Sequence, residues 1–145
     1  MIDIHMHIIP GVDDGAIDFI MAEEMLKMAA KQGVTSIIAT SHSDSFEYKA
    51  EKVIRNYRIL KNLITEKEIP LKIYLGSEVY CEPTYMASVL AALKSGIIPS
   101  MNGTKYVLTE FYDPTEEDAI FCINLLLEHG WIPVIAHGER YRKLS

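Results

Sequence analysis

The sequence of 145 residues has few cysteines, fewer basic than acidic residues and no long apolar run. Its two cysteines, Cys81 and Cys122, stand in no metal-binding or redox spacing, which argues against a disulfide framework. No arginine follows either cysteine at the Cys-x5-Arg spacing of thiol phosphatases, so that route to phosphate-ester hydrolysis is excluded. The formal net charge of −6 argues against nucleic acid as a partner, because phosphate backbones recruit basic faces.

Targeting and membrane signals are missing as well. The sequence has no basic leader and no apolar run long enough to span a bilayer, so we expect a cytoplasmic protein without membrane insertion. Apolar residues make up 49% and charged residues 23%, without a low-complexity segment. Because the length is that of about one domain, we expect residues 1–145 to form a single domain with a substantial core.

What the sequence does contain is a regular alternation of strand and helix signals. The predicted strands cover residues 2–7, 34–40, 71–75, 106–109 and 131–136, and the predicted helices cover residues 18–32, 48–68, 83–96 and 114–130. Asp18 and Asp113 are expected to cap the first and last helices, and Ile20 and Met28 are expected to face the core. Five βα units in succession predict an α/β fold with a parallel sheet, either open or curled into a barrel.

The opening stretch concentrates ligand-type side chains. On a strand, alternate residues share a face, so Asp3, His5 and His7 are expected on one side and apolar residues on the other. A Pro-Gly turn then presents Asp13 and Asp14. Imidazole and carboxylate together suit zinc, manganese or iron. The alternative is a polar strand face whose histidines only form hydrogen bonds.

Ligand-type residues also follow the other predicted strands. They are His42, Glu78, Glu110 and His137, one at the end of each strand. The carboxyl ends of parallel strands meet at one rim, where α/β folds build their sites. Together with His5 and His7 of the first strand, four of the five histidines therefore converge there. The sequence thus predicts a polynuclear metal site.

Five motifs resemble those of the polymerase and histidinol phosphatase (PHP) superfamily. Within it, the sequence is most similar to the bacterial metal-dependent protein-tyrosine phosphatases of capsule and exopolysaccharide operons. The motifs are Asp3–His7 with Pro10–Gly15, Ala39–His42, Gly76–Tyr80, Leu108–Phe111 and Ala136–Arg140. They span the chain in the order found in the family.

The resemblance implies a fold, a cofactor and a function. The fold is a distorted TIM-like (β/α)7 barrel, of which this chain carries about five βα units. The cofactor is up to three manganese ions, or iron, zinc or magnesium in their place. The implied metal ligands are His5, His7, Asp14, His42, Glu78, Glu110 and His137, and Arg140 is the implied catalytic, phosphate-binding residue. The substrate is a phosphotyrosine protein, in the first place a bacterial tyrosine kinase, in the regulation of capsular and exopolysaccharide synthesis.

Two departures from the family pattern leave alternatives open. Gly138 stands where relatives carry proline or an apolar residue. In addition, family members continue for about a hundred further residues that include a late Asp-x-His motif, and this sequence has neither. We therefore expect a fragment, a short form completed as a homo-oligomer, or a catalytically weak metal-binding remnant.

The sequence also leaves alternatives for the reaction and for the role of Arg140. A PHP-type phosphoesterase of small molecules is one alternative. A metal-dependent amidohydrolase is another, although its bridging lysine is missing where the fourth strand ends in Glu110. For Arg140 the alternative is a surface ion pair with Glu139.

Overall fold

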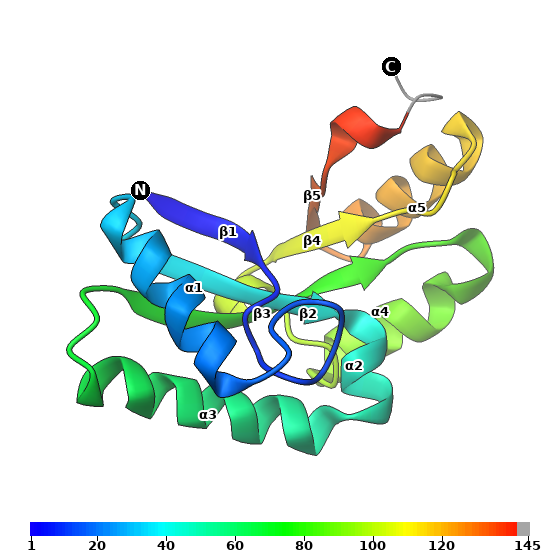
Figure 1. The fold of residues 1–145 in the computed structure, drawn as a ribbon. Coiled ribbons are helices and arrows are strands. Elements are labelled where there is room, and N and C mark those ends of the chain that lie inside the picture. Colours follow the sequence, from blue (N-terminus) through cyan, green and yellow to red (C-terminus); the bar gives the residue numbers. More distant parts are fainter. Residues whose placement is uncertain (142–145) are drawn as a thin grey trace.

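A curled sheet of five parallel strands organises the fold in the computed structural model, which describes residues 1–141. The strands are β1 (Ile2–Met6), β2 (Ser36–His42), β3 (Lys72–Tyr80), β4 (Tyr106–Glu110) and β5 (Ile132–Ile135). Each strand pairs with the one that follows it in sequence, in the order β1-β2-β3-β4-β5. The predicted α/β class with five βα units is confirmed, and the sheet forms half of a barrel (Figure 1).

Helices cover the outer face of the sheet (Figure 1). They are α1 (Phe19–Lys31), α2 (Ser43–Tyr48), α3 (Ala50–Glu66), α4 (Met86–Ser95) and α5 (Glu116–Glu128), with short 3-10 turns at Pro83–Tyr85, Met101–Gly103 and Gly138–Arg140. Fully buried side chains such as Leu26, Ile37, Leu60, Val79 and Leu126 fill the layer between helices and sheet. Within residues 1–141, no helix has both the length and the apolar character needed to cross a membrane.

The first helix buries a different face from the one expected. Asp18 caps α1 as predicted, since its side chain accepts a hydrogen bond from the Met21 N–H. However, Ile20 and Met28 are 73% and 61% exposed, and the buried side chains are Ala22, Leu26 and Ala29. Ile20 shares its face with Lys27 and Lys31, at i+7 and i+11. The buried residues form the apolar stripe at i, i+4 and i+7, so the helical spacing indicates this face and the expectation for Ile20 and Met28 was wrong.

The strand ends extend farther than the sequence patterns indicated. β2 continues to His42 and β3 to Tyr80, and His42 pairs with Glu78 in the ladder. The predicted helix over 48–68 corresponds to α3, and the short α2 before it was not predicted; Lys49, whose backbone is not helical, separates the two. Paired strands therefore carry His5, His42, Glu78 and Glu110, whereas His7, Asp14, His137 and Arg140 lie beyond strand ends.

The cap of the last helix also differs from the expectation. Thr115, not Asp113, caps α5, since its side chain accepts a hydrogen bond from the Asp118 N–H. Asp113 has a positive φ of 40°, which places it in the turn before the helix. The helix therefore begins two residues later than the proline pattern suggested.

Candidate metal centre

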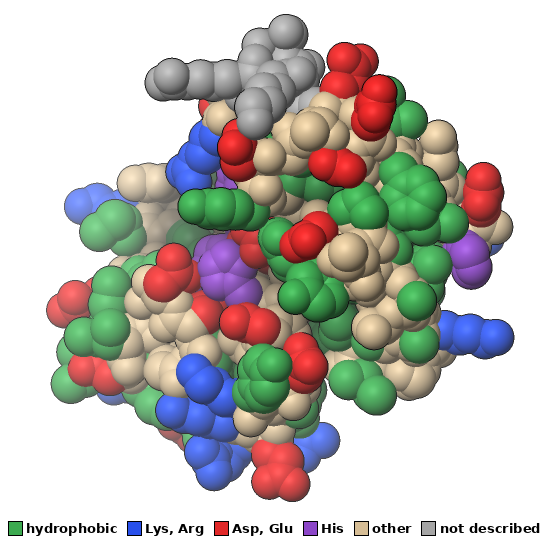
Figure 2. Space-filling view, turned by 90° about the vertical axis from the view of Figure 1, so that its right-hand side faces the viewer, with side chains coloured by type: hydrophobic (Ala, Val, Ile, Leu, Met, Phe, Trp, Pro, Cys, Tyr) green, Lys and Arg blue, Asp and Glu red, His purple; other side chains and the backbone are tan. Residues whose placement is uncertain are grey.

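The carboxyl ends of the strands surround a pocket of about 770 Å³. All eight residues singled out from the sequence line it: His5, His7, Asp14, His42, Glu78, Glu110, His137 and Arg140. Figure 2 shows a histidine side chain in a hollow on this face, with acidic side chains around it. The structure thus brings the expected residues together, while their roles as ligands and phosphate binder stay predictions.

The first strand supplies two histidines through an irregular ladder. Asp3 pairs with Ile37 but Met6 pairs with Ala39, so β1 has one more residue than β2 over this interval. The regular alternation predicted for β1 is therefore interrupted. Asp3 accepts a hydrogen bond from the His5 N–H at 3.0 Å and is not among the residues that line the pocket.

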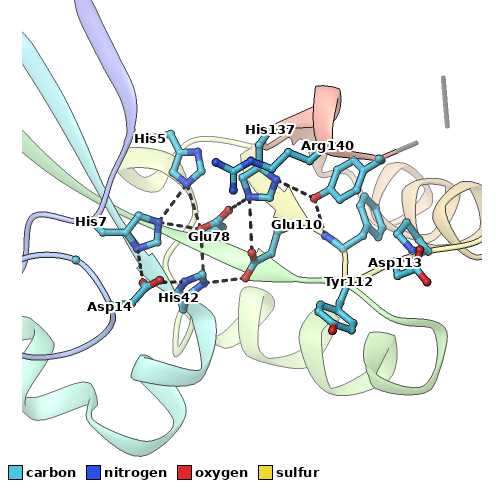
Figure 3. Close-up of a pocket in the computed structure, with 14 residues that line it drawn as sticks. His5, His7, Asp14, His42, Glu78, Glu110, Tyr112, Asp113, His137 and Arg140 are labelled. Atoms are coloured by element: carbon cyan, nitrogen blue, oxygen red, sulfur yellow. Dashed lines mark hydrogen bonds and ion pairs between the residues drawn. The ribbon is translucent and has the colours of Figure 1, made fainter. Parts of the chain in front are cut away.

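Glu78 lies at the centre of the cluster and is 1% exposed. Its Oε2 atom lies 3.1 Å from Nε2 of His5 and 2.9 Å from Nε2 of His7. Its Oε1 atom lies 2.8 Å from Nε2 of His137, and Nδ1 of His42 lies 3.5 Å from Oε2 (Figure 3). A buried carboxylate with nitrogen donors at both oxygens has the geometry of a bridging ligand.

His42 connects Glu78 to the outer carboxylates. Its Nδ1 atom lies 2.8 Å from Glu110 Oε1, and its Nε2 atom lies 3.2 Å from Asp14 Oδ1. The Asp14 side chain is 82% exposed, which leaves it open to the solvent side of the pocket. The outer part of the site is therefore built from one imidazole between two carboxylates.

The structure separates the two neighbouring aspartates by role. Asp13 Oδ2 lies 2.9 Å from Nδ1 of His7, and the carboxylate accepts hydrogen bonds from the N–H groups of Gly15 and His42. A ligand imidazole is commonly oriented by a partner on its other nitrogen. Asp13 therefore orients His7, whereas Asp14 faces the pocket.

The electrostatics of the cluster require positive charge among the carboxylates. Burial alone would lower the pKa of His7, but its bonds to Asp13 and Glu78 raise this pKa to about 10. The hydrogen bond to Glu110 raises the pKa of His42 to about 9 despite burial. Burial would raise the pKa of Glu78, yet the bonds from His5 and His7 lower it. The carboxylates thus favour positive charge between them, which protons on the histidines or metal cations can supply.

The donor set fits a polynuclear site for divalent transition metals. Three triplets have ligand atoms within 4.8 Å of one another: His5–Glu78–His137, His7–Asp14–His42 and His42–Glu78–Glu110. Glu78 and His42 each belong to two triplets. The two oxygens of Glu78 could serve two ions, whereas a neutral imidazole such as His42 would bind one ion through one of its nitrogens. Mixed imidazole and carboxylate donors suit manganese, iron or zinc.

Arg140 lies on the 3-10 turn that follows β5 and lines the same pocket. Its Nε atom is 3.9 Å from Glu139 Oε1, and the two side chains are 73% and 76% exposed. An exposed pair at this distance contributes little to stability, so the ion pair leaves the guanidinium available to a ligand. Among residues 1–141, a Cβ added at Gly138 would meet Ile135 at 3.7 Å, an ordinary contact, so these residues leave room for a side chain at this position.

Sequence reasoning missed the aromatic side of the pocket. Phe111, Tyr112, Pro114 and Tyr141 line it next to the charged cluster. Tyr141 is buried, whereas Tyr112 is 86% exposed and lies toward the rim. The position of Tyr141 directly after the motif that ends at Arg140 was the only signal that could have indicated it.

The two cysteines take no part in the site. Both are free and buried. Burial raises the pKa of Cys81 to about 12 and that of Cys122 to about 11. Thiols with such pKa values are not ionised near neutral pH and make poor nucleophiles.

Comparison with known proteins identifies relatives along the whole chain. The family model described as capsular polysaccharide synthesis, CpsB/CapC, matches residues 1–145. Tyrosine-protein phosphatase YwqE of Bacillus subtilis (strain 168) is 40% identical, with 99% of this chain and 56% of YwqE covered. Tyrosine-protein phosphatase CpsB of Streptococcus pneumoniae is 36% identical, with 100% of this chain and 59% of CpsB covered.

A solved structure has the same fold. It comes from crystal structures of YwqE from Bacillus subtilis and CpsB from Streptococcus pneumoniae, described as unique metal-dependent tyrosine phosphatases. The TM-score is 0.83 at 38% sequence identity, and the match covers 99% of this chain and 58% of the other. The chain thus spans between half and two thirds of the length of these relatives.

Proposed function

This chain belongs to the CpsB/CapC family of capsular polysaccharide synthesis, and from that premise we propose that it acts in the metal-dependent hydrolysis of phosphotyrosine on proteins. The observation that carries the proposal is the buried Glu78 carboxylate with four histidine side chains around it, at the rim where the strands end. The names of the relatives, tyrosine-protein phosphatases YwqE and CpsB, supply the reaction class.

The residues of the pocket suit an aryl phosphate. Metal ions held by the histidines and carboxylates would provide a hydroxide nucleophile at neutral pH and neutralise the phosphate. The planar guanidinium of Arg140 matches two phosphate oxygens. Tyr112 and Pro114 offer an aromatic and apolar wall to the substrate ring. A phenolate leaves without a strong general acid, because its conjugate acid has a pKa of about 10.

The finer parts of the proposal concern the metal, the partner and the compartment. Manganese is the proposed metal, because the family resemblance implies it and the donor set accommodates it. The proposed substrate is a phosphotyrosine protein, in the first place a bacterial tyrosine kinase that regulates capsule or exopolysaccharide synthesis. Free, buried cysteines are typical of reducing compartments, and we propose that the reaction takes place in the cytoplasm.

A phosphatase assay with metal-depleted and manganese-loaded protein tests the proposal. We expect manganese-dependent hydrolysis of a phosphotyrosine peptide and of p-nitrophenyl phosphate, and little hydrolysis of the matched phosphoserine peptide. The double variant His5→Ala/His7→Ala should lose both bound manganese and turnover. Manganese binding without hydrolysis of either aryl phosphate would contradict the proposal.

The same assay discriminates the rival reactions. Faster turnover of an alkyl phosphate than of the phosphotyrosine peptide would favour a small-molecule phosphoesterase. The amidohydrolase reading has no lysine to support it among the described residues that line the pocket.

A further inference from the structure

Tyr141 is buried beside the metal centre and contacts two neighbouring strand ends. Its hydroxyl oxygen accepts a hydrogen bond from the backbone N–H of Phe111, directly after β4, at 3.0 Å. The same oxygen lies 3.2 Å from Nδ1 of His137, directly after β5. The Tyr141 ring also packs edge-on against the Phe111 ring, with centroids 5.8 Å apart. Tyr141 therefore links the ends of β4 and β5.

The two ring nitrogens of His137 face different partners. Nε2 lies 2.8 Å from Glu78 Oε1 and belongs to the triplet with His5 and Glu78. Nδ1 faces away from the cluster, toward Tyr141 (Figure 3). The backbone of His137 has a φ of 35°, a conformation that costs energy in a residue with a side chain. Contacts around His137 must therefore hold its backbone in this conformation, and the contacts at the two ring nitrogens orient the ring.

We propose that Tyr141 is a positioning residue of the metal centre, whose hydroxyl oxygen accepts the Nδ1–H of His137 and so holds Nε2 toward Glu78. The inference rests on the proposed metal-dependent function. An imidazole that binds a metal through Nε2 carries its proton on Nδ1, and the partner of that proton fixes the tautomer and the ring orientation. A hydroxyl can donate or accept, so Tyr141 keeps Nδ1 paired both before and after Nε2 gives up its proton.

The arrangement at His7 supports this assignment. There, Nε2 also faces Glu78, at 2.9 Å, and Nδ1 lies 2.9 Å from the Asp13 carboxylate. Two of the imidazoles around Glu78 are thus held by the nitrogen that points away from it. His7 has a carboxylate as its partner and His137 has a phenol.

The variant Tyr141→Phe keeps the ring and removes the contact to Nδ1. We expect its affinity for Mn²⁺, measured by calorimetry, to fall about 10- to 100-fold, the usual cost of losing an outer partner of a ligand. The matched control is Tyr57→Phe, because the Tyr57 hydroxyl donates to the Ile73 carbonyl at 3.2 Å and does not line the pocket. This control should bind Mn²⁺ with the wild-type affinity.

A second measurement reads the tautomer directly. In the zinc-loaded wild type, imidazole ¹H–¹⁵N spectra should show the His137 proton on Nδ1 and protected from exchange with water. In Tyr141→Phe this protection should be lost.

Two results would overturn the inference. One is wild-type Mn²⁺ affinity in Tyr141→Phe, whatever its melting temperature, because a merely structural role lowers stability alone. The other is a His137 proton on Nε2 in the zinc-loaded wild type, which decides the matter even if the variant does not fold. Neither measurement reads turnover, so a failure of the proposed phosphatase activity remains distinguishable from a failure of this inference.

Discussion

At the scale of single residues, the proposed role of Arg140 separates phosphate binding from metal binding. Its guanidinium cannot ligate a cation, and its side chain lines the pocket beside His137. We expect Arg140→Ala to keep its bound metal and to lose about 2–4 kcal/mol of transition-state stabilisation, the usual effect of removing one preorganised electrostatic donor. Arg140→Lys should recover only part of this, because a point charge replaces a two-point contact.

The control for Arg140 is its neighbour in the exposed ion pair. Glu139→Ala removes the same pair but no phosphate-binding group. Kinetics and metal analysis of the variants should show loss of kcat/KM in Arg140→Ala alone. Wild-type turnover in Arg140→Ala would remove the residue from the proposed mechanism.

His7 and His42 make the stability of the metal-free protein dependent on pH. Their folded pKa values of about 10 and 9 lie above the ordinary value of 6.5. The folded state therefore binds these protons more tightly than the unfolded state, which stabilises it fully below pH 6.5. This stabilisation is lost as pH rises through 9 and 10. The lowered pKa of Glu78 acts in the opposite direction, and its contribution is lost as pH falls below the ordinary value of 4.5.

Melting temperatures of chelator-treated protein at pH 6 and pH 9 test this prediction. We expect a lower melting temperature at pH 9, and a smaller difference in His42→Gln. His129→Gln is the control, because His129 is exposed at the end of α5 and the described contact of its side chain is with the Leu125 carbonyl of its own helix. Equal pH dependence in wild type and His42→Gln would contradict the prediction.

Whether a site residue could be predicted from the sequence depended on its position relative to the end of a predicted strand. His42, Glu78, Glu110 and His137 could be grouped because parallel strands deliver their last residues to one rim. The spacing alone could not separate the roles of Asp13 and Asp14, because these depend on how a loop packs, and only the family resemblance singled out Asp14. Tyr141 was missed because its contacts with His137 and with Phe111 form only in the folded chain.

At the scale of elements, α3 holds the loop that carries Asp13 and Asp14. The buried Asn56 side chain donates to the Pro10 carbonyl at 2.9 Å, and Lys52 donates to the next carbonyl, that of Gly11, at 2.6 Å. Successive carbonyls of the loop thus find partners on one helix. The position of the ligand loop depends on this packing.

We expect Asn56→Ala to lower the free energy of unfolding by about 1–3 kcal/mol, because it leaves the buried Pro10 carbonyl without its partner. Metal affinity should fall as well, since the loop that carries Asp14 becomes less constrained. Asn62→Ala is the matched control, because Asn62 is exposed on the same helix. Denaturant unfolding and metal titration of both variants test the prediction, and equal losses of stability would contradict it.

Element boundaries were predictable where local chemistry sets them. Asp18 begins α1 and Gly33 follows its end because a side-chain cap and a left-handed φ of 88° are local requirements. The irregularity in β1 was not predictable, because it arises from pairing with β2. The buried face of α1 was predictable, because Ala22, Leu26 and Ala29 recur at i, i+4 and i+7, and the expectation for Ile20 overlooked this spacing.

At the scale of the whole molecule, the half-barrel of residues 1–141 has two open flanks. At one flank, β1 is an edge strand, and its Ile2 and Ile4 side chains are exposed by 62% and 42%. At the other, β5 is an edge strand, next to α5 with Phe121 and Leu127 about half exposed. Figure 1 shows these flanks at opposite sides of the sheet. The number of βα units made two edges predictable, but not which helix residues would lie at them.

Unpaired strand edges and exposed apolar side chains favour association with further polypeptide. We therefore expect this chain to form a homodimer or larger homo-oligomer at micromolar concentration, measured by light scattering coupled to size exclusion. Ile2→Glu or Phe121→Glu, which place a charge in one flank, should shift the distribution toward monomer. Ile59→Glu is the matched control, because Ile59 is also exposed, by 41%, but lies on α3 away from both edges. A wild-type chain that stays monomeric at micromolar concentration would refute the prediction, since the open flanks would then be stable in water.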